Sequence, residues 1–131
     1  MAITINDGVR NAAANAVGPL FNSGVINIYS GTPPAVGSAA TGDLLAEVTV
    51  GATAFGASAA GTITLNGVPL SDNSINLSGT AGYFRLIGGA NTLQGTVSAS
   101  GGGGDMIVDN VNLVQGGVFT INSATVTMPG G

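Results

Sequence analysis

Few residues of this chain are able to carry chemistry. Among its 131 residues the only basic side chains are Arg10 and Arg85, and there is no His and no Cys. The six acidic residues are Asp7, Asp43, Glu47, Asp72, Asp105 and Asp109. Without His, Cys or Lys, the chain lacks the usual pairs of nucleophile and base, and it lacks the thiolate and imidazole ligands of zinc sites.

Two pairs of acids have a spacing that could serve sugar chemistry. Asp43 and Glu47 are four positions apart, and Asp105 and Asp109 repeat that spacing. On a strand this spacing places both carboxylates on one face, and a glycoside hydrolase needs two carboxylates across a cleft. Sugar clefts also use aromatic platforms, whereas this chain has no Trp and only 5% aromatic residues. We therefore predict that the protein is not an enzyme and has no catalytic residues.

Loop oxygens offer a second chemistry, the binding of calcium. Asp72-Asn73, Asp105 and Asp109-Asn110 supply such oxygens, but no segment has the D-x-[DN]-x-[DN]-G spacing of a calcium loop. The Gly101–Gly104 tract is not followed by the Gly-Lys-Ser/Thr of a phosphate-binding loop. We predict solvated turn residues here, with no metal and no cofactor.

The scarcity of charge limits the partners. The formal net charge is −4, and charged residues make up 6% of the chain, against about 25% in an average globular protein. Two arginines cannot neutralise the phosphates of a nucleic acid or an anionic membrane surface, so we predict neither as a ligand. Soluble monomers stay apart through surface charge, so we expect this chain to associate with copies of itself or a larger assembly.

The first 24 residues are expected to form a helical arm. An apolar stripe follows helical spacing, and it consists of Val9, Ala12, Ala13, Ala16, Val17 and Leu20. Asn6 or Asp7 is placed to cap the start, and Gly18-Pro19 is expected to end or kink the helix. The helix is either a lid that covers the domain with this stripe or an arm that reaches a neighbour.

From Val25 onward the apolar residues alternate with a period of two, which predicts strands. The strands are short and separated by turn residues every 8 to 12 positions, which is typical of all-β domains. We predict one mainly β domain over residues 1–131, an antiparallel β-sandwich or jelly-roll-like barrel (residues 25–131) behind one short N-terminal helix (residues 1–24). The predicted core residues are Ile26, Phe84, Leu86, Phe119 and Val126.

Three segments within this body have distinctive patterns. Residues 82–87 are apolar on both faces, which predicts a central strand or one beneath an interface. The alternation from Val118 to Met128 changes parity, so we predict a bulge or bend at Asn122-Ser123. A long loop containing Pro33-Pro34 runs from Ser30 to Asp43, and with the N-terminal helix it is our predicted contact surface.

Five turn-and-strand motifs follow one another along the chain: Ile28-Tyr29-Ser30-Gly31-Thr32-Pro33-Pro34, Thr41-Gly42-Asp43-Leu44-Leu45-Ala46, Ala54-Phe55-Gly56, Gly79-Thr80-Ala81-Gly82-Tyr83-Phe84-Arg85 and Gln94-Gly95-Thr96-Val97. In this order they resemble a group of small β-rich virion proteins of tailed bacteriophages. The resemblance covers nearly the whole chain. The Gly101–Gly104 tract departs from the group, as does Gln94, where the group often has an acid.

The resemblance implies a structural protein of the virion, namely a capsid decoration or cement protein. Such a protein binds the outside of the lattice of the major capsid protein as a homo-oligomer, with a trimer favoured, and stabilises the head. Its expected location is the capsid surface, after synthesis in the host cytoplasm; no signal peptide is visible at Met1–Asn6. Two alternatives stay open: a tail, fibre or baseplate component, and a carbohydrate-binding, adhesin-like module.

Overall fold

The computed structural model describes residues 3–128 and is mainly β, as predicted. Helix α1 (Asp7–Val17) and the 3-10 helix η1 (Gly18–Phe21) come first. The strands are β1 (Val25–Ser30), β2 (Leu44–Thr49), β3 (Thr62–Thr64), β4 (Leu70–Asp72), β5 (Gly79–Gly88), β6 (Asn91–Ala99), β7 (Met106–Val108), β8 (Asn112–Leu113) and β9 (Phe119–Thr127). Asn6 caps α1, because its side-chain oxygen accepts a hydrogen bond from the Val9 N–H.

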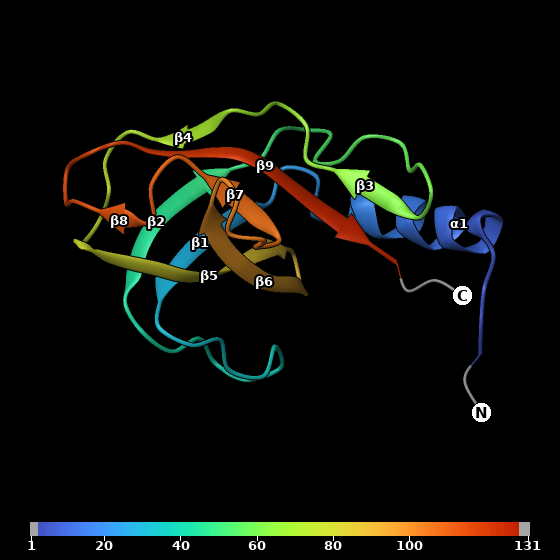
Figure 1. The fold of residues 1–131 in the computed structure, drawn as a ribbon, viewed down its shortest axis with the longest axis horizontal. Helices are drawn as coiled ribbons and strands as arrows, with labels where there is room; N and C mark the ends of the chain where they lie inside the picture. The colour runs from blue at the N-terminus through green and yellow to red at the C-terminus, as the bar shows by residue number, and fades with distance from the viewer. Residues whose placement is uncertain (1–2, 129–131) are drawn as a thin grey trace.

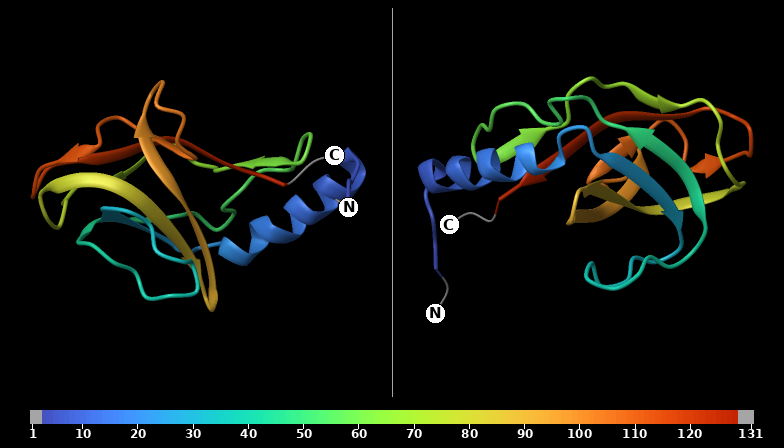
Figure 2. Two further views of the ribbon diagram at one scale, coloured as in Figure 1. Left: turned by 60° about the horizontal axis from the view of Figure 1, so that its bottom comes forward. Right: turned by 180° about the vertical axis from the view of Figure 1, so that it is seen from behind.

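The nine strands form one curled sheet in the order β2-β1-β5-β6-β7-β9-β3, with β4 beside β9 and β8 beside β5 (Figure 1). Figure 2 shows how far the sheet curves, with α1 extending from one end of the body. The sheet differs from the prediction in one respect: β6 and β7 run parallel, whereas every other pair is antiparallel. The chain reaches this arrangement through the Gly-rich connection between β6 and β7, residues 100–105.

The core lies on the concave side of the sheet, where the alternating apolar residues of neighbouring strands are in register. Ile26 of β1 pairs with Leu86 of β5, and Ile28 pairs with Phe84. The predicted core residues Ile26, Phe84, Leu86 and Phe119 are all buried, and Val126 packs against the core at its margin. β5 is the central strand and is buried on both faces, as its two-sided pattern predicted.

The predicted irregularity in the last strand is confirmed. Ile107 of β7 pairs with Ser123 of β9, but the next residue, Val108, pairs with Ile121. Asn122 is therefore the extra residue of a β-bulge, and the inward-facing positions change from odd to even numbers across it. Without this extra residue the later apolar side chains of β9 would face solvent.

The orientation of α1 corrects the lid alternative. Within residues 3–128 the helix packs on its own domain through Ala14, Gly18 and Phe21, all buried. The predicted apolar stripe is divided: Val17 packs against the core, whereas Val9 is 51% exposed and Leu20 is 50% exposed. Most of the stripe therefore does not cover the domain.

Candidate interaction surfaces

The acidic residues act as local acceptors of backbone hydrogen bonds. Asp72 accepts from the N–H groups of Glu47 and Ser74. Asp109 accepts from the N–H groups of Asn110 and Thr120. These bonds tie turns to neighbouring strands, which is the ordinary work of Asp in loops.

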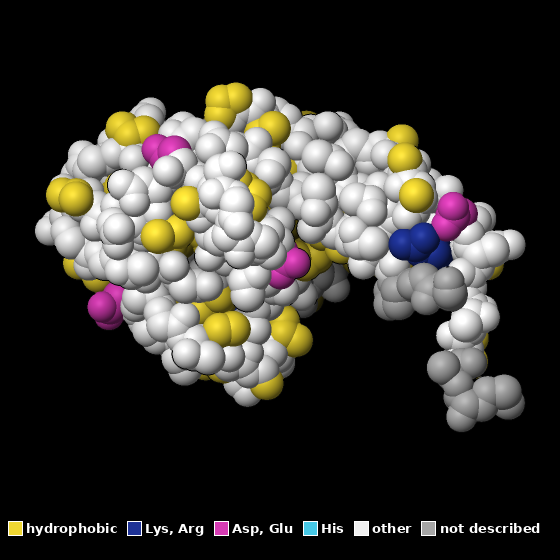
Figure 3. All heavy atoms as spheres, in the orientation of Figure 1, with side chains coloured by type: hydrophobic (Ala, Val, Ile, Leu, Met, Phe, Trp, Pro, Cys, Tyr) yellow, Lys and Arg dark blue, Asp and Glu magenta, His cyan; other side chains and the backbone are white. Residues whose placement is uncertain are grey.

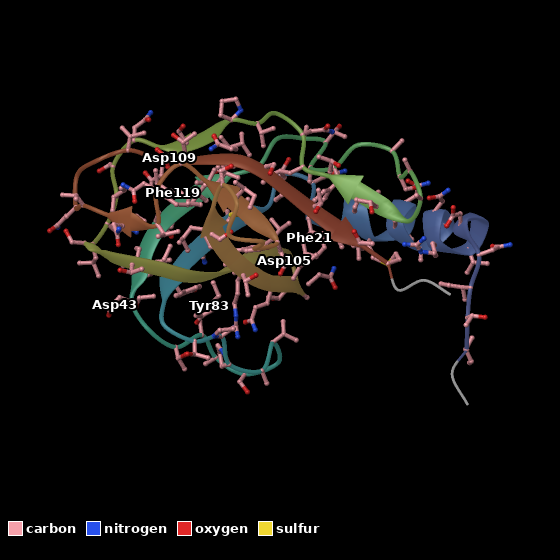
Figure 4. All side chains as sticks on the ribbon, viewed as in Figure 1. Phe21, Asp43, Tyr83, Asp105, Asp109 and Phe119 are labelled. Atoms are coloured by element: carbon pink, nitrogen blue, oxygen red, sulfur yellow. The ribbon has the colours of Figure 1, made fainter. Side chains whose placement is uncertain are left out.

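Asp105 and Asp109, one of the two acid pairs with four-residue spacing, do not form a shared site. Asp105 and Asp109 lie at opposite ends of β7: the first bonds to Thr96 of β6 and the second to Thr120 of β9. Figure 4 shows Asp43, Asp105 and Asp109 on separate parts of the body. Among the residues described, no three acids lie close enough together to hold a metal ion.

The depressions in the surface are small. One of about 180 Å³ lies between β6 and β9, and one of about 230 Å³ lies beside Asp109 and Leu113. Ligand pockets are larger as a class, roughly 300–1,000 Å³. A wider space of about 540 Å³ is the open angle between α1 and the segment before it, lined by Thr4, Ile5, Asn6 and Val9. The molecule is better suited to binding through its surfaces than through a pocket.

The Ser30–Asp43 loop is fixed to the convex face of the sheet. The Tyr83 hydroxyl donates to the Thr41 carbonyl and accepts from the Thr41 N–H at 3.0 Å. Arg85 donates to the Ala35 carbonyl at 3.2 Å, and the Gln94 amide donates to the Pro34 carbonyl at 2.6 Å. Tyr83 is consequently buried, and the loop presents a fixed surface.

Arg85 is a buried cation whose acceptors are neutral. Its side chain is paired across β5 and β6 with Gln94, whose Oε1 accepts from Arg85 Nε at 2.8 Å. Arg85 is 7% exposed, and the ion pair found in the described part of the chain joins Arg10 to Asp7. The sequence showed the position of Arg85 on a two-faced strand, but not that a loop would cover it.

Polar side chains hold α1 in its orientation. Arg10 donates from Nε and Nη2 to the Met128 carbonyl, at 3.3 and 3.1 Å. The Asn11 side-chain oxygen accepts from the Gly61 N–H at 2.9 Å, and that of Asn15 accepts from the Ser58 N–H at 3.0 Å. In the sequence these three residues lie off the apolar stripe, but nothing in their pattern indicates which groups they would bind.

The opposite side of α1 forms an outward apolar face, which we define as Val9, Ala12, Ala13, Ala16 and Leu20. Four of these residues are exposed and Ala13 is partly exposed. None carries a charge, and Figure 3 shows a molecular surface with few coloured charges overall. We take this uncharged, outward face as the candidate contact surface of the helix.

Comparisons with known proteins assign this chain to no family. No protein-family model, no curated protein and no solved structure matches the chain. No helix within residues 3–128 is long and apolar enough to cross a membrane.

Proposed function

We propose that this chain is a structural virion protein, a capsid decoration protein that binds the outside of the lattice of the major capsid protein and stabilises the head. The observation that carries the assembly part of the proposal is the outward apolar face of α1, fixed by Arg10, Asn11 and Asn15. The sequence motifs that resemble tailed-phage virion proteins supply the virion part.

In this proposal the chain stabilises the head mechanically, through contacts between protein surfaces. The α1–η1 segment spans roughly 22 Å at 1.5 Å per residue and is about 10 Å wide. Its footprint is therefore roughly 220 Å², well below the about 800 Å² per partner of a stable two-protein interface. One helix contact is weak by itself, so stabilisation of a capsid requires many copies and further contact surfaces. Homo-oligomerisation, for which we favour a trimer, would join several such faces in one particle.

Purified virions and their separated heads and tails provide the test. We expect the chain in heads, in numbers proportional to the major capsid protein, and on the outer surface in cryo-EM maps. Detection in tails with none in heads would overturn the capsid assignment.

A substitution tests the assigned surface. Leu20→Glu places a charge on the outward apolar face at a half-exposed position, so we expect a folded protein with at least tenfold weaker binding to capsids. Val118→Glu is the matched control, because Val118 is 57% exposed and lies at the start of β9, away from α1 (Figure 1). Equal binding by the Leu20→Glu variant and the wild type would show that this face makes no capsid contact.

A further inference from the structure

The sheet contains a gap between β6 and β9 where β7 ends. β6 spans nine residues and β9 spans nine, but β7 between them has only three. β7 pairs with residues 97–99 of β6 and with residues 121–124 of β9. In the part of the chain that the structure describes, no strand lies between residues 91–96 of β6 and residues 125–127 of β9.

The width of this gap follows from the strands that flank β7. Neighbouring strands lie about 4.8 Å apart, so two strands on either side of a third are roughly 9.6 Å apart. Where β7 ends, β6 and β9 are therefore separated by the width of one strand. The depression of about 180 Å³ lies in this position, and its walls are Leu93 to Gly95 and Thr125 to Thr127. We call this depression the strand slot.

The floor and the closed end of the strand slot are formed by two residues. Phe84 of β5 lies at the floor. Asp105, just before β7, closes the end: its Oδ2 accepts from the Thr96 N–H at 3.0 Å, and its carbonyl accepts from the Thr125 N–H at 3.3 Å. The other lining side chains are uncharged. An unpaired strand edge beside an apolar floor favours the addition of a strand from another chain.

The segment before α1 has the chemistry of such a strand. Ile3, Thr4 and Ile5 precede the helix cap and have no regular structure of their own. Ile3 is 92% exposed, and all three residues are β-branched and uncharged, which favours a strand. Its end is extended, since Asn6 has φ −84° and ψ 174°. In Figures 1 and 2 this segment leaves the far end of α1 and points away from the body.

We propose that the strand slot of one copy receives residues 3–5 of a second copy as an added strand. The bonds from Arg10 to Met128 hold α1 in place, and the arm leaves α1 at the end that lies away from the body (Figure 1), so it is free to reach a neighbouring copy. The uncharged arm suits the uncharged walls of the slot, and its backbone groups would pair with the open edges of β6 and β9. This inference deepens the self-association part of the proposed function and rests on it.

Disulfide trapping in the full chain tests the pairing directly, since the native protein contains no Cys. One sample carries Ile3→Cys and a second carries Thr127→Cys, at the exposed mouth of the slot. Mixed and oxidised, they are expected to form a heterodimer with a yield at least tenfold above that of Ile3→Cys mixed with Val118→Cys. Equal yields in the two mixtures would overturn the proposal.

A proline variant tests the backbone pairing. Thr4→Pro removes an N–H and disfavours strand pairing, so we expect at least a tenfold rise in the concentration at which the protein associates in sedimentation velocity. Thr4→Val keeps the N–H and is expected to associate like the wild type. Association of Thr4→Pro at the wild-type concentration would overturn the strand slot but leave the capsid proposal intact. A wild-type protein that stays monomeric at all concentrations would overturn both the slot and the self-association part of the function, whereas capsid binding is measured separately.

Discussion

Tyr83 and Tyr29 form a matched pair for testing how the Ser30–Asp43 loop is held. Their rings are stacked, with centroids 5.1 Å apart and an interplanar angle of 17°. The hydroxyl of Tyr83 makes two bonds to Thr41, whereas that of Tyr29 receives one long contact of 3.5 Å from the Asn27 amide. Removing the Tyr83 hydroxyl therefore removes two bonds to the loop, whereas removing the Tyr29 hydroxyl leaves the attachment of the loop unchanged.

We expect Tyr83→Phe to lower the free energy of unfolding by about 1–2 kcal/mol. Two neutral hydrogen bonds contribute about 1 kcal/mol each, and water can reach the exposed Thr41 once they are lost, which reduces the cost. For a chain of this length the melting temperature should fall by roughly 3–8 °C. Tyr29→Phe should cost less than about 0.5 kcal/mol, because a contact at 3.5 Å is weak.

Urea unfolding of both variants gives the free energies, and amide hydrogen exchange gives a local measure. The Thr41 N–H should exchange faster in Tyr83→Phe and at the wild-type rate in Tyr29→Phe. The reasoning is refuted if the two variants lose equal stability and the Thr41 amide exchanges unchanged in both.

Three further predictions concern the helix, the sheet and the core. Ala12→Glu should lower the free energy of unfolding by less than about 0.5 kcal/mol because Ala12 faces outward, whereas Ala14→Glu should lower it by over about 3 kcal/mol because it buries a charge. Thermal unfolding of the two variants measures the difference, and equal losses would show that α1 is oriented differently. Gly82→Ala should lower the free energy of unfolding by over about 2 kcal/mol, since the added Cβ would lie 2.0 Å from the Gly31 carbonyl oxygen. The control Gly51→Ala adds a Cβ that meets no atom within 4 Å, so thermal unfolding should show no change in stability. Ile121→Val should cost about 1 kcal/mol in urea unfolding, because Ile121 is 0% exposed; a neutral result would place it outside the tightly packed core.

Much of the fold could be predicted from local patterns in the sequence. The helix cap was predicted at Asn6 or Asp7 and is Asn6, the two-faced segment 82–87 lies in the interior strand β5, and the irregularity predicted at Asn122-Ser123 is a bulge at Asn122. Each of these features depends on a few neighbouring residues. The parallel pairing of β6 and β7 was not predicted, because Gly-rich connections are compatible with either direction. The sequence pattern fixes which residues face inward on a strand, but it does not fix the strand's neighbours.

The orientation of α1 could not be predicted from its apolar stripe. Hydrophobic spacing favours burial of Val9 and Leu20, but three polar residues on the other side bond to groups far along the chain, at Ser58, Gly61 and Met128. Such bonds depend on the finished tertiary structure. The spacing of Asp105 and Asp109 likewise does not determine whether they share a site, because the short strand β7 lies between them and each binds a different neighbouring strand.

The bond from Arg10 to Met128 joins residues 118 positions apart in the chain. The bonds of α1 to Ser58 and Gly61 can form once half of the chain has been synthesised, but the bond to Met128, the residue that follows β9, closes only at the end of synthesis. A chain cut before Met128 would therefore hold its helix by fewer bonds. Under the proposed capsid function, such a chain would present the outward apolar face less firmly and bind capsids more weakly than the full chain.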